Sequence, residues 1–212
     1  MKLFLASYRF GAHADEFVSL TSGPGRVAVV ANAADGWPPA ARSSAVLSEI
    51  RGLRDLGFDP FELDLRAFVD RPADLDAVLD SVPTLWVRGG NTFVLASRLE
   101  QCGAGDAISS RVRGGSLVFA GYSAGACIAQ TSLHGIELAD DPAEVRIATG
   151  GEVTGNGLGL VDLAFVPHYR SILDDLGAGP SMVAGYERDN VPHVTLTDEQ
   201  VYLVDSDRAE RI

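Results

Sequence analysis

An apolar run that ends abruptly in glycines and other small residues limits the folds open to this chain. Residues 117–120 read Leu-Val-Phe-Ala, and residues 121–126 continue as Gly-Tyr-Ser-Ala-Gly-Ala. This is the G-x-S-x-G pattern of a nucleophile elbow, a sharp turn between a buried strand and a helix. The neighbours of the serine must be small, a condition that Gly121 and Gly125 meet. The pattern predicts Ser123 at the end of a strand, although a glycine-rich turn with an incidental serine would look the same.

Strands and helices alternate through the rest of the chain. Short apolar runs predict buried strands at 2–7, 26–31, 58–65, 84–87 and 117–120, and helical spacing predicts helices at 39–56, 74–80 and 92–101. This alternation implies a mostly parallel sheet with right-handed crossovers, in one α/β domain over residues 1–212. Ligands bind such sheets beyond the carboxyl ends of the strands. The glycine turns at 89–90 and 121–125 both follow such ends.

The chain after the elbow helix is less regular. Residues 131–159 form an acidic, irregular segment, followed by an apolar strand at 160–166 that leads into Pro-His-Tyr, and by a short helix at 181–187. Two further runs, 191–196 and 200–204, flank the triplet Thr-Asp-Glu at 197–199. Two apolar runs around a polar triplet predict a terminal β-hairpin.

Charge and composition exclude several classes of function. The net charge of -12, with Lys2 as the only lysine, argues against a nucleic-acid partner, because phosphates would be repelled. No run of 18 apolar residues predicts a membrane span. The N-terminus reads as a strand rather than a signal peptide, and Cys102 and Cys127 have no disulfide or metal-ligand spacing, so we expect a cytoplasmic protein. Whether it forms a homodimer is left open.

A serine hydroxyl needs a base to become a nucleophile at neutral pH, and the chain offers four histidines. His168 is the candidate base, because it follows a buried strand at the expected active edge of the sheet. His193 is the alternative, although a structural role in a hairpin strand suits it better. His13 lies in a polar loop, and His134 lies in the irregular segment.

A third group must hold the imidazole in one tautomer, and the acidic segment between Ser123 and His168 supplies the candidates. Glu137 is the first choice for this acid and Asp141 the second, although a solvated acidic loop would also carry such charges. The backbone N–H groups of Ala124 and Gly90 are the candidate oxyanion hole. The turn at Gly90 could instead serve only to cap the next helix, with Asn91 as N-cap, and both roles are compatible.

Three motifs together resemble the peptidase E family, the S51 group of serine peptidases, which is related to cyanophycinase. They are Val-Arg-Gly-Gly-Asn-Thr-Phe at 87–93, Gly-Tyr-Ser-Ala-Gly-Ala at 121–126 and Val-Pro-His-Tyr at 166–169, in the order and approximate spacing of that family. The resemblance covers most of the chain. It implies a flavodoxin-like, class I glutamine amidotransferase-like fold and a Ser-His-acid triad. Carried over, Ser123 is the nucleophile, His168 the base, and Gly90 and Ala124 the oxyanion hole.

The expected activity is that of a serine exopeptidase, a dipeptidase on short peptides, that works through an acyl-enzyme on Ser123 without metal or organic cofactor. Two departures from the family bear on this expectation. Residues 133–138, Leu-His-Gly-Ile-Glu-Leu, replace the Asn-Asp pair of the aspartyl-specific enzymes, and the Gly- and Arg-rich stretch expected after His168 is absent. An α/β-hydrolase esterase, which would favour His193, and an inactive amidotransferase-like binding domain are the alternatives.

Recognition of an acidic peptide would require a cation. A charged chain end or an N-terminal Asp side chain needs a fixed positive group, and arginine suits a carboxylate because its planar fork binds both oxygens. Arg88 precedes the first glycine turn, and Arg170 follows His168 by two residues. With Asn91 they are the candidate substrate-binding residues, although each arginine could equally be a surface residue paired with a neighbouring carboxylate.

Overall fold

A seven-stranded sheet forms the centre of the structure, a computed structural model that describes residues 1–174, 177–206 and 208–212. Its strands are β1 (Lys2–Ala6), β2 (Arg26–Val30), β3 (Asp59–Glu62), β4 (Thr84–Val87), β5 (Val118–Tyr122), β8 (Val201–Asp205) and β9 (Arg208–Arg211), in the order β3-β2-β4-β5-β1-β8-β9. The first five strands in this order are parallel, while β8 and β9 are antiparallel to their neighbours. The predicted α/β class is therefore confirmed.

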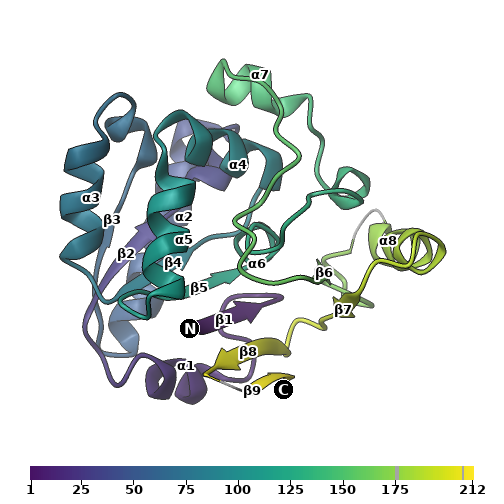
Figure 1. Cartoon of the computed structure of the whole chain (residues 1–212), viewed down its shortest axis with the longest axis horizontal. Helices are drawn as coiled ribbons and strands as arrows, with labels where there is room; N and C mark the ends of the chain where they lie inside the picture. Colours follow the sequence, from purple (N-terminus) through teal and green to yellow (C-terminus); the bar gives the residue numbers. More distant parts are fainter. Residues whose placement is uncertain (175–176, 207) are drawn as a thin grey trace.

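Helices cover both faces of this sheet (Figure 1). Along β1, Phe4 and Ala6 pack with residues of α1 (Ala14–Leu20) and α2 (Pro39–Asp55), whereas Leu3 and Leu5 belong to the core beneath α3 (Pro72–Asp80), α4 (Thr92–Gln101) and α5 (Ala104–Arg113). Successive side chains of a strand point to opposite faces, so continuous apolar strands bury residues on both sides. Among the described residues, no helix combines the length and apolar character that crossing a bilayer requires.

The second half of the chain adds short elements around the main sheet. They are α6 (Ala124–Cys127), α7 (Glu144–Thr149), β6 (Ala164–Val166), α8 (Ala178–Arg188) and β7 (His193–Thr195), with single 3₁₀ turns at η1 (Asn32–Ala34), η2 (Leu65–Phe68) and η3 (Ile136–Leu138). Strands β6 and β7 form a separate parallel pair joined through α8, which makes a β-α-β unit. In Figure 1 this unit lies beyond the carboxyl ends of β1 and β5.

The terminal hairpin is present, but one strand later than the sequence predicted. The run at 191–196 forms β7, which pairs in parallel with β6 instead of turning back on β8. The hairpin partner of β8 is β9, and β8 also pairs with β1. The polar triplet at 197–199 is thus a connection between two sheets. Helices α1 and α5 were not predicted from the sequence.

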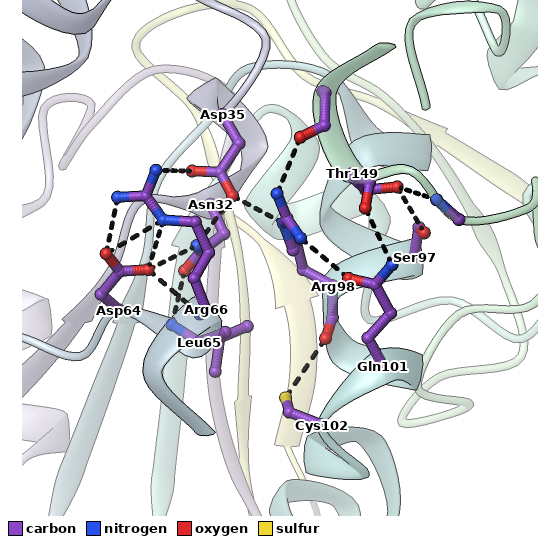
Figure 2. A network of polar contacts seen from close by, with 12 residues as sticks. Asn32, Asp35, Asp64, Leu65, Arg66, Ser97, Arg98, Gln101, Cys102 and Thr149 are labelled. Carbon is purple, nitrogen blue, oxygen red and sulfur yellow. Dashed lines mark hydrogen bonds and ion pairs between the residues drawn. The ribbon is translucent and has the colours of Figure 1, made fainter. Parts of the chain in front are cut away.

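A charged network ties η1 to the helices next to it (Figure 2). Asp35, whose side chain is only 1% exposed, accepts hydrogen bonds from Arg42 Nε and Arg98 Nε, both at 2.8 Å. Asn32 Nδ2 donates to the same carboxylate at 3.0 Å. The network holds η1 in place, and η1 in turn fixes the turn after β4, because Ala33 O accepts a hydrogen bond from Asn91 N at 2.8 Å.

Candidate active site

Ser123 occupies the turn between β5 and α6 in a backbone conformation that side chains rarely adopt. Its φ is 52° and its ψ is -119°. Such strain persists only where the surrounding structure enforces it, and it is concentrated at functional sites. The helix that follows begins at Ala124, whose N–H has no acceptor in a preceding helical turn. The strand–turn–helix geometry predicted from the sequence is confirmed.

The glycines around Ser123 are required by close backbone contacts. A Cβ at Gly121 would lie 2.5 Å from Gly125 O, and one at Gly125 would lie closer still to Val87 O, at the end of β4. A Cβ at Gly89 would lie 2.9 Å from the Ser123 Cβ. Three chain segments therefore meet at van der Waals distance around the serine, which explains why the pattern needs glycine on both sides.

His168 follows β6 and is held by contacts on both its backbone and its ring. Its N–H donates to Ser7 Oγ at 2.7 Å, and its ring Nδ1 lies 2.6 Å from Asp198 Oδ1. Ser7, fully buried at the end of β1, also donates its hydroxyl hydrogen to Asp198 Oδ1 at 3.0 Å. Because Nδ1 is engaged by a carboxylate, Nε2 is the ring nitrogen left to act as a base.

Asp198 is stabilised as an anion. Burial acts to raise the pKa of its carboxyl, but hydrogen bonds from Ser171, His168 and Ser7 outweigh it, so that the pKa lies below its usual range. A carboxylate that stays ionised and is bonded to Nδ1 holds the imidazole in one tautomer and stabilises the imidazolium. This is the geometry that a serine nucleophile requires of a third group.

Sequence reasoning missed Asp198, although a signal for it was available. The predicted strand at 160–166, helix at 181–187 and strand at 191–196 together form the β6–α8–β7 unit. Strands joined through a crossover helix are parallel and end at the same edge. His168 follows the first of these strands and Asp198 the second. Because 191–196 was predicted to form half of a hairpin, the sequence did not place Asp198 at the same edge as His168.

The two acids favoured from the sequence lie elsewhere. Glu137 accepts a hydrogen bond from Gly135 N at 2.7 Å and lies 3.7 Å from His134, and its side chain is 44% exposed. Asp141 accepts from Ala143 N at 2.8 Å. Among the described residues, His168 has an ion pair with neither of them. The structure does not bring Glu137 or Asp141 to His168.

His193 is also placed apart from Ser123. It lies in β7, where its Nδ1 is 3.0 Å from Val191 O and its ring lies against the ring of Tyr186, with centroids 5.6 Å apart. These contacts are those of a packed structural side chain. They give no support to the arrangement that an α/β-hydrolase esterase would need.

The turn after β4 runs next to the elbow. Asn91 caps α4, since its Oδ1 accepts from Phe93 N and Val94 N while its Nδ2 donates to Asp141 O. The predicted N-cap is confirmed, and the side chain is occupied by these bonds. Gly90, with φ of 149°, packs against Ala33, so that a side chain there would clash. The N–H groups of Gly90 and Ala124 belong to the two turns that adjoin Ser123.

The two candidate arginines lie outside the cavity next to Ser123. Arg88 donates from Nη1 to Gly89 O at 2.6 Å, lies 3.4 Å from Glu49, and stacks on Trp37 at 4.6 Å. Arg170 is exposed and stacks on Tyr169 at 5.3 Å. Neither guanidinium group is among the described residues that line this cavity.

A single cavity of about 410 Å³ contains the chemistry of the site. Its wall includes Ser123, Ala124, His168, Thr92, Asp140 and Asp174, together with apolar residues from η3 and α8. The volume is at the small end of the range for ligand sites, roughly 300–1,000 Å³. Among the described residues, no three His, Cys, Asp or Glu side chains gather as metal ligands would.

Comparison with known proteins finds peptidases among the relatives of this chain. The chain is 32% identical over 122 residues to the uncharacterized peptidase Lin0382 of Listeria innocua, and 30% identical over 121 residues to the uncharacterized peptidase Lmo0363 of Listeria monocytogenes. The matched residues are 58% and 57% of this chain. They span about half the length of these curated relatives, 55% and 56%.

Two solved structures share the fold. A candidate peptidase E protein from Listeria monocytogenes EGD-e superposes with a TM-score of 0.81 at 23% identity, covering all of this chain and 97% of the other. A peptidase from an acI-B1 Actinobacterium gives a TM-score of 0.76 at 16% identity, with all of this chain and 86% of the other covered. The sequence profile of peptidase family S51 matches residues 38–212, which include the elbow, His168 and Asp198. The chain therefore belongs to peptidase family S51.

Proposed function

We propose that this chain is a serine peptidase that cleaves short peptides, with Ser123 as nucleophile, His168 as base and Asp198 as the acid that orients it. The observation that carries the proposal is that a strained serine and a histidine bonded to a carboxylate line one cavity. Asp198 takes the role that the sequence suggested for Glu137 or Asp141. Family membership supports the same reaction class.

The reaction follows from the positions of these groups. Ser123 Oγ attacks the scissile carbonyl carbon while His168 Nε2 takes its proton, and Asp198 stabilises the imidazolium that results. The carbonyl oxygen, now negative, receives hydrogen bonds from the N–H groups of Ala124 and Gly90. His168 then gives the proton to the leaving amine. A water molecule, activated by the same histidine, hydrolyses the acyl-enzyme and frees Ser123.

The proposed reaction requires His168 and Ser123 to come into hydrogen-bond contact. No hydrogen bond joins Ser123 Oγ to His168 among the described residues, although both side chains line the cavity. In substrate-free enzymes such bonds are often long and shorten when substrate binds. The positive φ of His168, 57°, places the ring on a strained turn that is anchored by Ser7 and Asp198.

The cavity supports short substrates and exopeptidase action. Residues of η3 and α8 contribute to its wall, and its volume of about 410 Å³ suits a short peptide better than a long chain. A preference for N-terminal Asp is not part of the proposal. The described residues of the cavity wall include no arginine or lysine that would bind a second carboxylate.

A fluorophosphonate probe tests the assignment directly, because it labels only an activated serine. We expect the wild-type protein to be labelled and Ser123→Ala to remain unlabelled, with peptide hydrolysis lost in parallel. An unlabelled wild-type protein would instead favour a binding domain without catalysis. Hydrolysis of esters but of no dipeptide or aminoacyl anilide would favour an esterase.

A further inference from the structure

A buried carboxylate outside the Ser123 cavity has no part in the proposed mechanism. Glu49 lies in α2 and is 3% exposed. Its Oε1 accepts a hydrogen bond from the Tyr122 hydroxyl at 2.7 Å, and its Oε2 accepts one from Trp86 Nε1 at 3.0 Å. Arg88 Nε lies 3.4 Å from the same Oε1. Burying a charge is costly unless partners compensate it, so Glu49 depends on these three side chains.

The contact with Arg88 leads to the proposed oxyanion hole. Arg88 Nη1 donates to Gly89 O at 2.6 Å. The Gly89 C=O and the Gly90 N–H belong to one planar trans peptide unit, in which they point in opposite directions. A bond that fixes the carbonyl therefore also fixes the direction of the N–H. Among the described residues, the Gly90 N–H has no backbone acceptor, so it is available to an oxyanion.

The contact with Tyr122 leads to the elbow. Tyr122 is the last residue of β5 and directly precedes Ser123. Burial raises the pKa of the Tyr122 hydroxyl, and the charge of Glu49 acts in the same direction. The hydroxyl therefore stays protonated and donates to the carboxylate. This bond fixes the side chain at the end of the strand, from which the strained backbone of Ser123 continues.

The two contacts converge on Ser123. Gly89 packs so closely that a Cβ there would lie 2.9 Å from Ser123 Cβ and 3.1 Å from Tyr122 Cε2. One carboxylate thus connects the segment that carries the serine with the turn that carries the Gly90 N–H. Oxyanion-hole donors are effective when they are held in advance at the place where charge develops. Because Glu49 is anchored in α2, it limits the movement of both segments.

We propose that Glu49 and Arg88 are positioning residues for the oxyanion hole, an inference that rests on the proposed function. Arg88 orients the Gly90 N–H, and Glu49 holds Arg88 in place. Through Tyr122, Glu49 also fixes the end of the strand before Ser123. Neither Glu49 nor Arg88 is among the described residues that line the cavity. We therefore expect their loss to lower kcat and to leave KM nearly unchanged, because the oxyanion hole acts on the transition state more than on the bound substrate.

The first test uses Arg88→Met in the full chain, a change that removes the guanidinium donor but keeps an unbranched apolar stem. On alanyl p-nitroanilide, we expect kcat to fall roughly 10- to 100-fold with KM within about threefold of wild type, because a misplacement of about 1 Å can cost about 100-fold. The rate of labelling by a fluorophosphonate should fall by a similar factor, since its phosphoryl oxygen enters the same hole. Arg88→Lys keeps a charge and a donor, so it should recover part of the lost kcat.

A double variant separates positioning from stability. Glu49→Gln and Arg88→Met each leave one member of a buried ion pair without its partner, so each should have a lowered melting temperature and a lowered kcat. The double variant Glu49→Gln/Arg88→Met removes both charges and should melt above either single variant. Its kcat should nevertheless stay as low as that of Arg88→Met, because Gly89 O still lacks its donor. A role in stability alone would raise kcat together with the melting temperature.

Two further variants test the other contacts of Glu49. Tyr122→Phe removes only the hydroxyl, and it should lower kcat by roughly 10-fold, the worth of one hydrogen bond, without changing KM. Trp86→Phe is the matched control, because it also removes one donor to Glu49, but from a side chain fully buried in the core. It should lower the melting temperature and leave kcat within about twofold of wild type.

Several outcomes would overturn the inference. An unchanged kcat in folded Arg88→Met would show that the oxyanion hole does not depend on this contact, and a higher KM with an unchanged kcat would assign Arg88 to substrate binding. Equal losses of kcat in Tyr122→Phe and Trp86→Phe would indicate a general effect of the core. If Glu49→Gln does not fold, Arg88→Lys and Tyr122→Phe still decide. Absence of probe labelling and of peptide hydrolysis in the wild-type protein would instead reject the proposed function.

Discussion

Two buried carboxylates near the same edge of the sheet have opposite surroundings. Asp35, after β2, accepts hydrogen bonds from Arg98 and Asn32 (Figure 2) and also from Arg42, so its charge is neutralised inside the protein. Asp140, in the cavity wall, has one backbone N–H and no arginine or lysine among the described lining residues. The first arrangement supports the fold. The second leaves the charge of Asp140 without a cationic partner among the described lining residues.

The same comparison separates residues that hold the fold in place from residues that line the cavity. The Asp35 network fixes η1, η1 fixes the turn at Gly90, and this turn adjoins Ser123. Changes in the network should therefore act on stability, and changes in the cavity on catalysis or binding. Four variants test that division.

Ser123→Ala should have the largest effect. We expect kcat/KM to fall by more than about 10³-fold, because loss of a nucleophile removes the covalent path and leaves only binding and the oxyanion hole. The change is small and the site is partly exposed, so the melting temperature should remain near the wild-type value. Activity would be measured on an aminoacyl anilide and stability by thermal unfolding. Residual activity near wild type would remove Ser123 from the mechanism.

Asp198→Asn should come next, with kcat lowered by roughly 10³- to 10⁴-fold. An amide keeps the shape of the side chain but holds the wrong imidazole tautomer. Glu137→Gln is the matched control, because the sequence pointed to it and the structure places it away from His168; its kcat should stay near wild type. The reverse pattern would return the acid to the segment after the elbow.

Asp35→Asn should act on folding rather than on chemistry. It leaves the guanidinium group of Arg98 without a carboxylate partner among the described residues, whereas Arg42 keeps Glu62 at 2.8 Å. Removing one partner of a buried ion pair typically costs about 3–5 kcal/mol. We expect a lower urea midpoint with an unchanged slope, while activity per folded molecule stays within about threefold of wild type. A large loss of kcat in a fully folded sample would show that the network takes part in the reaction.

Asp140→Asn should change stability less than Asp35→Asn does, and with the opposite sign. Because the pKa of Asp140 is raised in the folded state, the folded protein holds this proton more tightly than the unfolded chain, and stability falls as pH rises through that pKa. Because asparagine does not ionise, the variant does not lose stability in this way. Its melting temperature should exceed that of wild type at pH 7 and should match it near pH 3. A less stable variant at pH 7 would mean that Asp140 is compensated by contacts.

The sequence predicted most of what local patterns determine. The strands that lead to Ser123 and His168, the elbow and the Asn91 cap all follow from spacing, steric limits and short-range hydrogen bonding, and the structure confirms these elements. Asp198 could not be found this way. Its approach to His168 depends on whether β7 pairs with β6 or with β8, which is a long-range choice.

The charge of the cavity could not be predicted from the sequence either. Arg88 and Arg170 are close to the motifs in sequence, yet their guanidinium groups have partners outside the cavity. Asp140 was one of several acids in an irregular segment, and its neighbours in sequence do not reveal that Thr92 is bonded to it. Which charge faces a cavity is set by tertiary packing rather than by distance along the chain.

The bond between Ser7 and Asp198 connects residues 191 positions apart in the chain. During synthesis the elbow at Ser123 leaves the ribosome long before Asp198 does, so a nascent chain carries Ser123 without the proposed pair of His168 and Asp198. Only when residues 193–205 have been made can β7 align beside β6 and β8 beside β1. Prematurely terminated chains that lack this region would thus have no peptidase activity. Activity would arise only at a late stage of translation.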